Sequence, residues 1–314
     1  MALNPQPFSP QEIEDNVREG VKRFVRSRLS EESAPYTASF NAARPRVEKL
    51  FAETDDLRSL DPRAFLRLSP KGRPQIDLDA LDVARYLSAP MVSKDNLDDL
   101  ARLDLQSYEP LAEPVPILLQ AEQIATILGR SLDPFRFPWL PERREPTSHE
   151  RRSAIDWTTS TYALERVRTD RRLSGSKHQE ASVADALRSI DWHECPPRTL
   201  VYPDDLDKGF FMRESRLADE KCDVPTRLKD GRLLAIECKV SNTSINSVKR
   251  VLRETGGKAL KWRQNYGDRQ VLTAIVLSGV FKSSDILKAQ SEFGIFVVFD
   301  HDLARLTDFV QSAT

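Results

Sequence analysis

The spacing of apolar residues in the first half of the chain predicts a series of helices. Residues 9–12, Ser-Pro-Gln-Glu, have the form of a capping box with proline at the first helical position. Apolar residues then recur at helical spacing from Ile13 to Val25. Further helices are expected over 45–58, 79–88, 94–104 and 116–128, the last of them closed by Gly129.

The pattern changes after a stretch rich in proline and charge at 138–146, which we interpret as a linker. Beyond it the sequence predicts helices at 153–170, 176–189, 246–266, 284–292 and 302–310. Apolar runs typical of strands lie at 199–202, 221–228, 233–240, 271–277 and 295–299. This mixture indicates an α/β domain over 151–314, preceded by a mainly α-helical region over 1–150. Gly256-Gly257 interrupts one expected helix and predicts a kink or a close approach there.

Composition excludes several classes of protein. The 314 residues are 30% charged and 39% hydrophobic, and they contain no run of 18 apolar residues that would span a membrane. The first residues lack the basic and apolar regions of a signal peptide, so we expect a cytoplasmic protein without a membrane partner. Three cysteines without a CxxC or HExxH motif argue against a disulfide framework and a zinc site.

Positive charge gathers in the second half of the chain. Residues 1–150 carry 20 basic and 25 acidic residues, whereas residues 151–314 carry 27 and 23. Within 236–263 there are seven basic residues and two acidic ones. Such a run is typical either of a surface that binds a polyanion or of a solvated helix face, and charge alone does not choose between them.

Two charged residues end the most apolar strand of the sequence. In the run 233–240, Glu237 and Lys239 share one face, and Cys238 belongs to the other, where we expect it to be a core residue. An unpaired ion in a core costs several kcal/mol, so such residues are usually paired, metal-bound or catalytic. A plain salt bridge at a strand edge is the alternative.

A hairpin brings a third charged residue to this face. A three-residue loop at 229–231, with Gly231 in the left-handed conformation, places Asp223 opposite Glu237 and Val224 opposite Ile236. Two carboxylates about 5 Å apart repel each other unless a cation lies between them. Mg²⁺ suits such a pair because it takes carboxylate oxygens, keeps waters and adds phosphate oxygens. Together with Lys239, the pair predicts metal-dependent hydrolysis of a phosphodiester.

The aspartate, the 13-residue gap and the Glu-Cys-Lys triplet resemble the PD-(D/E)XK nuclease superfamily, whose core is a mixed sheet flanked by helices. The wider segments 223–242, 246–250, 276–281 and 301–303 look like those of XamI-type type II restriction endonucleases. The resemblance covers about the last 140 residues. One departure is that Cys222, in place of proline, precedes Asp223.

The resemblance implies the role of each site residue. Asp223 and Glu237 would bind Mg²⁺ together with the main-chain carbonyl of Cys238, and Lys239 would be the catalytic lysine. In this superfamily a glutamate on the helix before the aspartate strand often joins the site, and Glu180 is the best match here. The products would carry 5′-phosphate and 3′-hydroxyl ends.

The resemblance also implies double-stranded DNA as the substrate, cut at a short palindromic site by a homodimer. A cognate DNA methyltransferase would act on the same site without forming a stable complex. A repair or junction-resolving nuclease and a non-catalytic DNA-binding protein remain as alternatives. The candidate DNA contacts are polar residues of the loop and helix after the motif strand: Asn242, Ser244, Asn246, Ser247, Lys249, Arg250, Arg253, Lys258 and Lys261.

Overall fold

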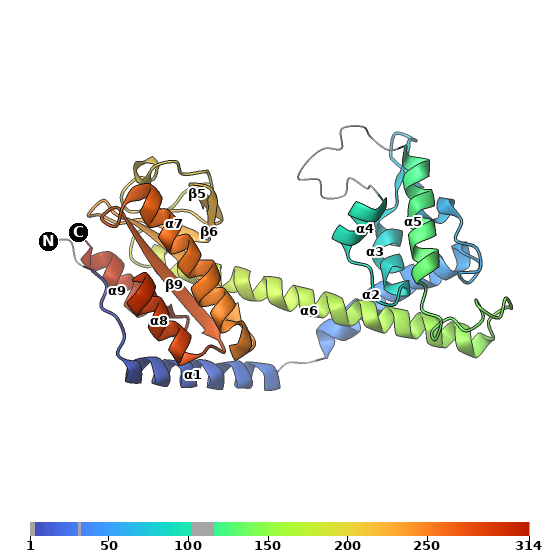
Figure 1. Ribbon diagram of the computed structural model, residues 1–314, viewed down its shortest axis with the longest axis horizontal. Helices are drawn as coiled ribbons and strands as arrows, with labels where there is room; N and C mark the ends of the chain where they lie inside the picture. The colour runs from blue at the N-terminus through green and yellow to red at the C-terminus, as the bar shows by residue number, and fades with distance from the viewer. Residues whose placement is uncertain (1–3, 31–32, 102–115, 314) are drawn as a thin grey trace. The chain divides into compact units, whose positions relative to one another are not determined.

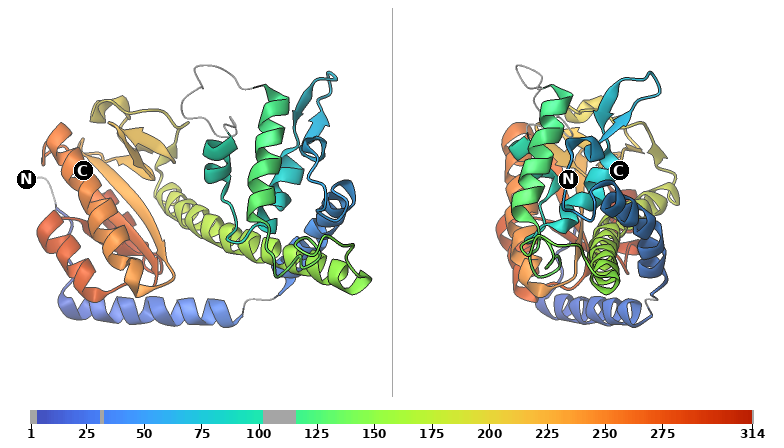
Figure 2. Two further views of the ribbon diagram at one scale, coloured as in Figure 1. Left: turned by 45° about the vertical axis from the view of Figure 1, so that its right-hand side comes forward. Right: turned by 90° about the vertical axis from the view of Figure 1, so that its right-hand side faces the viewer.

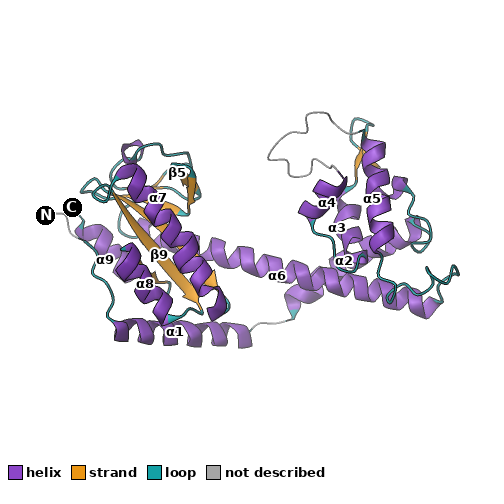
Figure 3. Ribbon diagram, viewed as in Figure 1, coloured by secondary structure: helices purple, strands orange, loops and turns teal. Residues whose placement is uncertain are grey.

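The computed structural model describes residues 4–30, 33–101 and 116–313, and its chain divides into two compact units. The sheet unit comprises residues 1–31 and 171–314, and the helical unit comprises residues 32–170. The sequence placed a boundary near residue 150, whereas this division falls inside a helix, and it assigns the first helix of the chain to the sheet unit. Figures 1 and 3 show the elements of each unit.

Helices make up most of the helical unit. They are α2 (Ala34–Glu53), α3 (Leu78–Ala84), α4 (Lys94–Ala101), α5 (Ile117–Ser131) and the first part of α6 (Ser148–Arg188), with a small antiparallel pair of strands, β1 (Leu66–Leu68) and β2 (Pro74–Ile76). Their apolar faces form one core with buried Phe51, Leu87 and Ile124. The end of the expected helix 94–104, beyond residue 101, lies outside the described residues.

Three details of the helical unit differ from the expectation. Helix α2 starts at Ala34 and not at 45. The stretch before Pro45 contains several alanines, which favour helix, and the helix continues through Pro45. Gly129 lies inside α5, which continues to Ser131, so it is not the residue that closes the helix. The stretch 138–146 is irregular, but Trp139 in it is fully buried in the core of this unit and its indole N–H donates to the carbonyl of Asp56 at 2.8 Å.

Helix α6 is continuous over 41 residues, where the sequence predicted two helices separated near 171–175. Gly175 lies in its interior, and a Cβ atom there would be 3.6 Å from a methyl group of Val240. That is an ordinary van der Waals distance, so Gly175 lies at a packing contact between the helix and the strand that holds Val240. Residues of α6 up to 170 belong to the helical unit, and those from 171 onward belong to the sheet unit.

A six-stranded mixed sheet forms the centre of the sheet unit as described by the structure, in the order β10-β9-β8-β7-β4-β3. Its strands are β3 (His193–Glu194), β4 (Phe210–Phe211), β7 (Val224–Arg227), β8 (Leu233–Ser241), β9 (Val271–Gly279) and β10 (Phe296–Phe299). Strands β8, β9 and β10 run parallel, and β7 pairs antiparallel with β8. The predicted α/β class is therefore confirmed.

Helices cover both faces of this sheet. On one face, α6 and α9 (Ala304–Ser312) pack on Ile236 and Val276. On the other, α1 (Pro10–Leu29), α7 (Gly257–Tyr266) and α8 (Ser283–Phe293) pack on the sheet, with α1 running beside α8 (Figures 1 and 2). The capping box that the sequence predicted at the start of α1 is present.

The run 221–228 is divided at Asp223 into β6 (Glu220–Cys222) and β7, and β6 pairs with β5 (Ser215–Leu217) in a separate two-stranded sheet. The run 199–202 is not a strand, because only Leu200 makes a bridge, to Leu217. The expected helix 246–266 consists of a π-helix at Val248–Gly256 followed by α7. Within the described ranges, no helix is long and apolar enough to cross a membrane.

Candidate active site

The β7–β8 hairpin has the register that the sequence predicted. Val224 pairs with Ile236, and the N–H of Leu228 donates to the carbonyl of Arg232 at 2.9 Å. Gly231 closes the three-residue loop with φ of +95°, a conformation that glycine adopts without a Cβ penalty. Continuing the pairing by one residue places Asp223 opposite Glu237.

Three charged side chains converge at this end of the hairpin. The ammonium of Lys239 lies 2.6 Å from Glu237 Oε2 and 3.4 Å from Asp223 Oδ2. The main-chain N–H of Cys238 donates to the same Asp223 oxygen at 2.8 Å, which fixes the aspartate against β8. Glu237 is fully buried, and the Cys238 side chain belongs to the core on the other face of the sheet, as expected.

A second lysine reaches the same carboxylate. The Lys258 ammonium, from α7, is 2.9 Å from each of the two Glu237 oxygens and also donates to the carbonyl of Lys221. The sequence assigned Lys258 to an exposed basic face instead. A π-helix has i→i+5 hydrogen bonds, so the π-helical segment rotates later positions away from the 3.6-residue register assumed for a continuous α-helix.

A close approach at Gly256 confirms one sequence expectation for this helix. A Cβ atom at Gly256 would lie 3.0 Å from the ring of Phe293 on α8. Glycine therefore allows the junction between the π-helix and α7 to pack directly on α8. The junction fixes where α7 begins, and Lys258 lies in its first turn.

Electrostatics distinguish the acids of this cluster from ordinary surface carboxylates. Burial raises the pKa of Glu237, an effect that Lys239 and Lys258 oppose and Asp223 reinforces. Burial alone would lower the pKa of Lys239, but the Glu237 and Asp223 carboxylates raise it above its ordinary value. Lys239 is therefore an ammonium at neutral pH.

Glu180 approaches the cluster from α6. It is 8% exposed, and burial together with the charge of Asp223 raises its pKa to about 7. Its neighbour Gln179 has a different contact, because its amide donates to the main-chain carbonyl of Val276 at 3.0 Å. Of Gln179 and Glu180, it is therefore Glu180 that interacts electrostatically with Asp223.

The donor set fits a hard divalent cation bound by few protein groups. Within the described residues, no three or more His, Cys, Asp or Glu side chains are grouped as a metal centre. Mg²⁺ commonly uses only one or two carboxylates and keeps several waters. Asp223 and Glu237 provide such a pair, and beside them burial together with the Asp223 charge raises the pKa of Glu180.

The candidate DNA contacts differ in their exposure. Lys249, Arg253 and Lys261 are exposed, and Lys261 forms an ion pair with Glu220. Arg250 and Ser244 are half-buried, whereas Asn242 and Asn246 are exposed. Ser247 is fully buried and its hydroxyl accepts a hydrogen bond from the main-chain N–H of Lys282 at 3.2 Å, so it does not face solvent.

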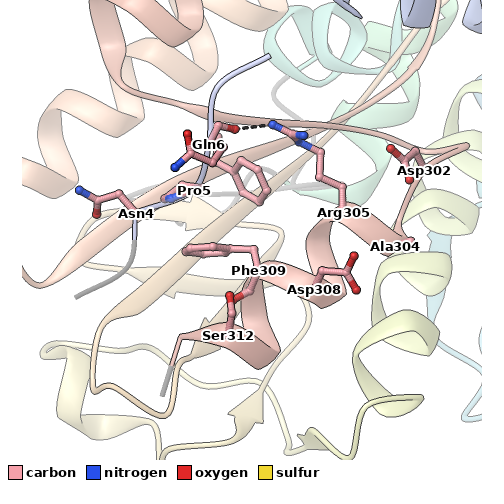
Figure 4. Close-up of a pocket in the computed structure, with 10 residues that line it drawn as sticks. Asn4, Pro5, Gln6, Asp302, Ala304, Arg305, Asp308, Phe309 and Ser312 are labelled. Atoms are coloured by element: carbon pink, nitrogen blue, oxygen red, sulfur yellow. Dashed lines mark hydrogen bonds between the residues drawn. The ribbon is translucent and has the colours of Figure 1, made fainter. Parts of the chain in front are cut away.

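A pocket of about 500 Å³ elsewhere in the sheet unit shares no lining residue with this cluster. It lies between the N-terminal segment and α9, where the Arg305 guanidinium donates to the carbonyl of Gln6 (Figure 4). The same guanidinium lies 3.6 Å from the centre of the Phe8 ring. These contacts attach the N-terminal segment to α9, and the pocket is the space left between them.

An aspartate beside one strand and Glu-x-Lys on its antiparallel neighbour form the arrangement that the sequence resemblance to PD-(D/E)XK nucleases led us to expect. The family model of the XamI restriction endonuclease matches residues 72–299. Type II restriction enzyme XamI of Xanthomonas campestris pv. amaranthicola is 32% identical over 279 residues, which span 87% of this chain and 96% of that enzyme. The chain belongs to the XamI restriction endonuclease family and is a type II restriction enzyme.

Among solved structures, the crystal structure of protein VC1899 from Vibrio cholerae matches 85% of this chain and 57% of its own, with 13% identity and a TM-score of 0.30. Likeness at that level does not bear on function. Family membership, in contrast, decides among the three hypotheses drawn from the sequence, and it favours restriction over junction resolution or binding without catalysis.

Proposed function

We propose that this enzyme hydrolyses phosphodiester bonds in double-stranded DNA at a short palindromic site and leaves 5′-phosphate and 3′-hydroxyl ends. The observation that carries the proposal is the convergence of Asp223, Glu237 and Lys239 at the end of the β7–β8 hairpin. Its setting supports the proposal, because a fully buried glutamate with a raised pKa is costly to keep without a function.

In this proposal Asp223, Glu237 and the main-chain carbonyl of Cys238 hold Mg²⁺, and Glu180 adds a further carboxylate. The bound ion would polarise the phosphoryl oxygens and make a water molecule a better nucleophile. Lys239 acts as a cation, since its raised pKa keeps it protonated. Its ammonium can donate a hydrogen bond that orients the water, and its charge stabilises the negative charge that develops on the phosphoryl group.

We assign DNA contacts to those candidate residues after the motif strand that are exposed or half-buried and do not contact Glu237. Those residues are Asn242, Ser244, Asn246, Lys249, Arg250, Arg253 and Lys261. Replacing Arg250, Arg253 and Lys261 with alanine should weaken binding equally for cognate and random duplexes and reduce the salt dependence, because each lost phosphate contact removes about 0.9 from the slope of log affinity against log salt. An unchanged slope would identify this face as a solvated surface.

The helical unit and the partners complete the proposal. Two copies of the chain, related by a two-fold axis, would each cut one strand of a palindromic site. The helical unit would contribute to dimerisation, to target reading or to both. We place the enzyme in the cytoplasm of a prokaryotic cell, where a cognate methyltransferase would modify the same site without a stable complex.

Digestion of a sequenced plasmid tests the proposal directly. Fragments with discrete ends are expected with Mg²⁺, and no cleavage is expected with excess EDTA or with Glu237→Gln. Mapping the ends identifies the target and the position of the cut. If the enzyme cut only branched or damaged DNA, the junction-resolving or repair alternative would replace restriction.

A further inference from the structure

Lys258 uses both oxygens of a carboxylate that is proposed to bind metal. Its ammonium is 2.9 Å from Glu237 Oε1 and 2.9 Å from Oε2. Lys239 already approaches Oε2 at 2.6 Å. A fully buried glutamate therefore has two lysine partners, and one of them covers both of its oxygens.

Charge balance shows why this arrangement bears on metal binding. Asp223 and Glu237 carry two negative charges, and Lys239 and Lys258 balance them. Adding a divalent cation to the same carboxylates would leave an excess of positive charge in a poorly solvated site. The ion must therefore displace a lysine or share the Glu237 oxygens with it.

Lys258 is better placed to leave than Lys239. Lys239 extends from the same strand as Glu237 and contacts both carboxylates. Lys258 extends from α7, its side chain is 17% exposed, and its only carboxylate contact in the described structure is with Glu237. Lys261, one turn further along the same helix, is exposed, so Lys258 lies next to a surface that DNA phosphates would approach.

We propose that Lys258 is a positioning residue that occupies the metal-binding oxygens of Glu237 until DNA draws its ammonium away, and so makes divalent-ion binding depend on DNA. The inference rests on the proposed role of Glu237 as a metal ligand. Lys258 would link DNA binding to metal binding, because the ammonium that leaves Glu237 can pair with a DNA phosphate. In the absence of DNA, metal binding is correspondingly weak.

Binding of Mn²⁺ to the whole protein without DNA measures this competition apart from catalysis. Electron paramagnetic resonance counts the free ion in titrations of wild type, Lys258→Met and Lys258→Gln. Each variant should bind Mn²⁺ about tenfold or more tightly than wild type, since removing a like charge within 4–6 Å typically changes such equilibria by that factor. Lys258→Arg keeps the charge and should retain weak binding.

Lys261→Met is the matched control, because it removes a lysine from the same helix whose ion-pair partner is Glu220 and not Glu237. It should bind Mn²⁺ as wild type does. Titration with a non-cleavable duplex completes the test: DNA should strengthen Mn²⁺ binding to wild type and have a much smaller effect on Lys258→Met. Lys258→Gln gives the same information if Lys258→Met does not fold.

Two outcomes separate this inference from the proposed function. If Glu237→Gln abolishes Mn²⁺ binding but both Lys258 variants bind as wild type does, or more weakly, Lys258 is a structural partner and the inference is wrong. If Glu237→Gln retains both Mn²⁺ binding and cleavage, the assignment of Glu237 as a metal ligand fails, and the inference fails with it.

Discussion

Each unit of the molecule surrounds an acidic side chain with cations, and the two surroundings have opposite effects on the pKa of that acid. In the helical unit, Asp82 accepts a hydrogen bond from the Tyr162 hydroxyl at 2.8 Å. Arg85, Arg46 and Lys94 lie 3.5, 3.6 and 3.9 Å from its oxygens. Burial alone would raise its pKa, but the Tyr162 hydrogen bond and these cations lower it below the ordinary value.

In the sheet unit burial outweighs the nearby cations, and the pKa values of Glu237 and Glu180 are raised. Glu237 has ammonium groups within 3 Å, yet complete burial and the Asp223 charge raise its pKa. Glu180 has its pKa raised to about 7 by burial and by the same aspartate. The fold thus holds Asp82 where hydrogen bonding and cations outweigh burial, whereas it holds Glu237 and Glu180 where burial and the Asp223 charge outweigh the nearby cations.

The largest predicted effect distinguishes these two sites by their contribution to catalysis. Glu237→Gln should abolish detectable cleavage while the protein stays folded, since it removes the charge of a proposed metal ligand but keeps the side-chain shape. The loss of several kcal/mol of transition-state stabilisation corresponds to about a thousandfold or more in rate. Asp223→Asn should behave alike, as measured by single-turnover cleavage at equal folded fraction.

Asp82→Asn is the matched control for that measurement, because it makes the same carboxylate-to-amide change in the other unit. It should cut at the wild-type rate per folded molecule. Cleavage by Glu237→Gln within a few-fold of wild type would show that Glu237 and Asp82 do not differ in function.

Lys239→Ala should lower the single-turnover rate by a factor of roughly 10² to 10⁴, the usual range for a removed group that assists proton transfer or charge stabilisation. Mn²⁺ and DNA should still bind, because the carboxylates remain. Unfolding of the variant, or cleavage at the normal rate, would instead identify Lys239 as the plain salt-bridge partner of Glu237.

The hairpin was predictable from sequence because its information is local. Side-chain alternation fixed the face of Glu237, and the three-residue loop closed by Gly231 was chosen because it puts Asp223 on that face, so the register followed. The place of Lys258 was not predictable, since a π-helix changes the angular position of later residues and its sequence has no established signature. Helix α6 was divided in error because Gly175 is as typical of a break as of close packing.

The Asp82 network shows a second limit of sequence analysis. Its members lie at positions 46, 82, 85, 94 and 162, and they come together only when separate helices pack. The fold class was accessible from the order of the elements, whereas a cluster assembled from distant positions has no local pattern to reveal it.

The effect of Asp82→Asn on stability should be moderate. Loss of the charge leaves three neighbouring cations without their shared partner, which should lower the free energy of unfolding by about 2 kcal/mol. Urea unfolding at neutral pH measures the change. A loss below about 0.5 kcal/mol would mean that the lowered pKa of Asp82 does not reflect net stabilisation by these cations.

The last predicted effect concerns the pH dependence of stability through Glu180. Its pKa rises from 4.5 in the unfolded chain to about 7 in the folded protein, so between these values the folded state binds more protons. Stability is then lost as pH rises through this window, by about 1 to 3 kcal/mol. Glu180→Gln removes this titration. The free energy of unfolding of the variant minus that of wild type should therefore be larger at pH 8 than at pH 5.

Urea unfolding in EDTA at both pH values measures this change, and Glu194→Gln is the control from the same unit. Burial would raise the pKa of Glu194, but Arg213 and Arg188 lower it, so Glu194 is ionised at pH 5 and at pH 8. Its substitution should therefore cost the same at both. Added Mn²⁺ should reduce the gain from Glu180→Gln at pH 8, because a cation bound at the cluster would favour the charged form of Glu180. A gain independent of pH would show that Glu180 is an ordinary helix-surface acid and does not belong to the cluster.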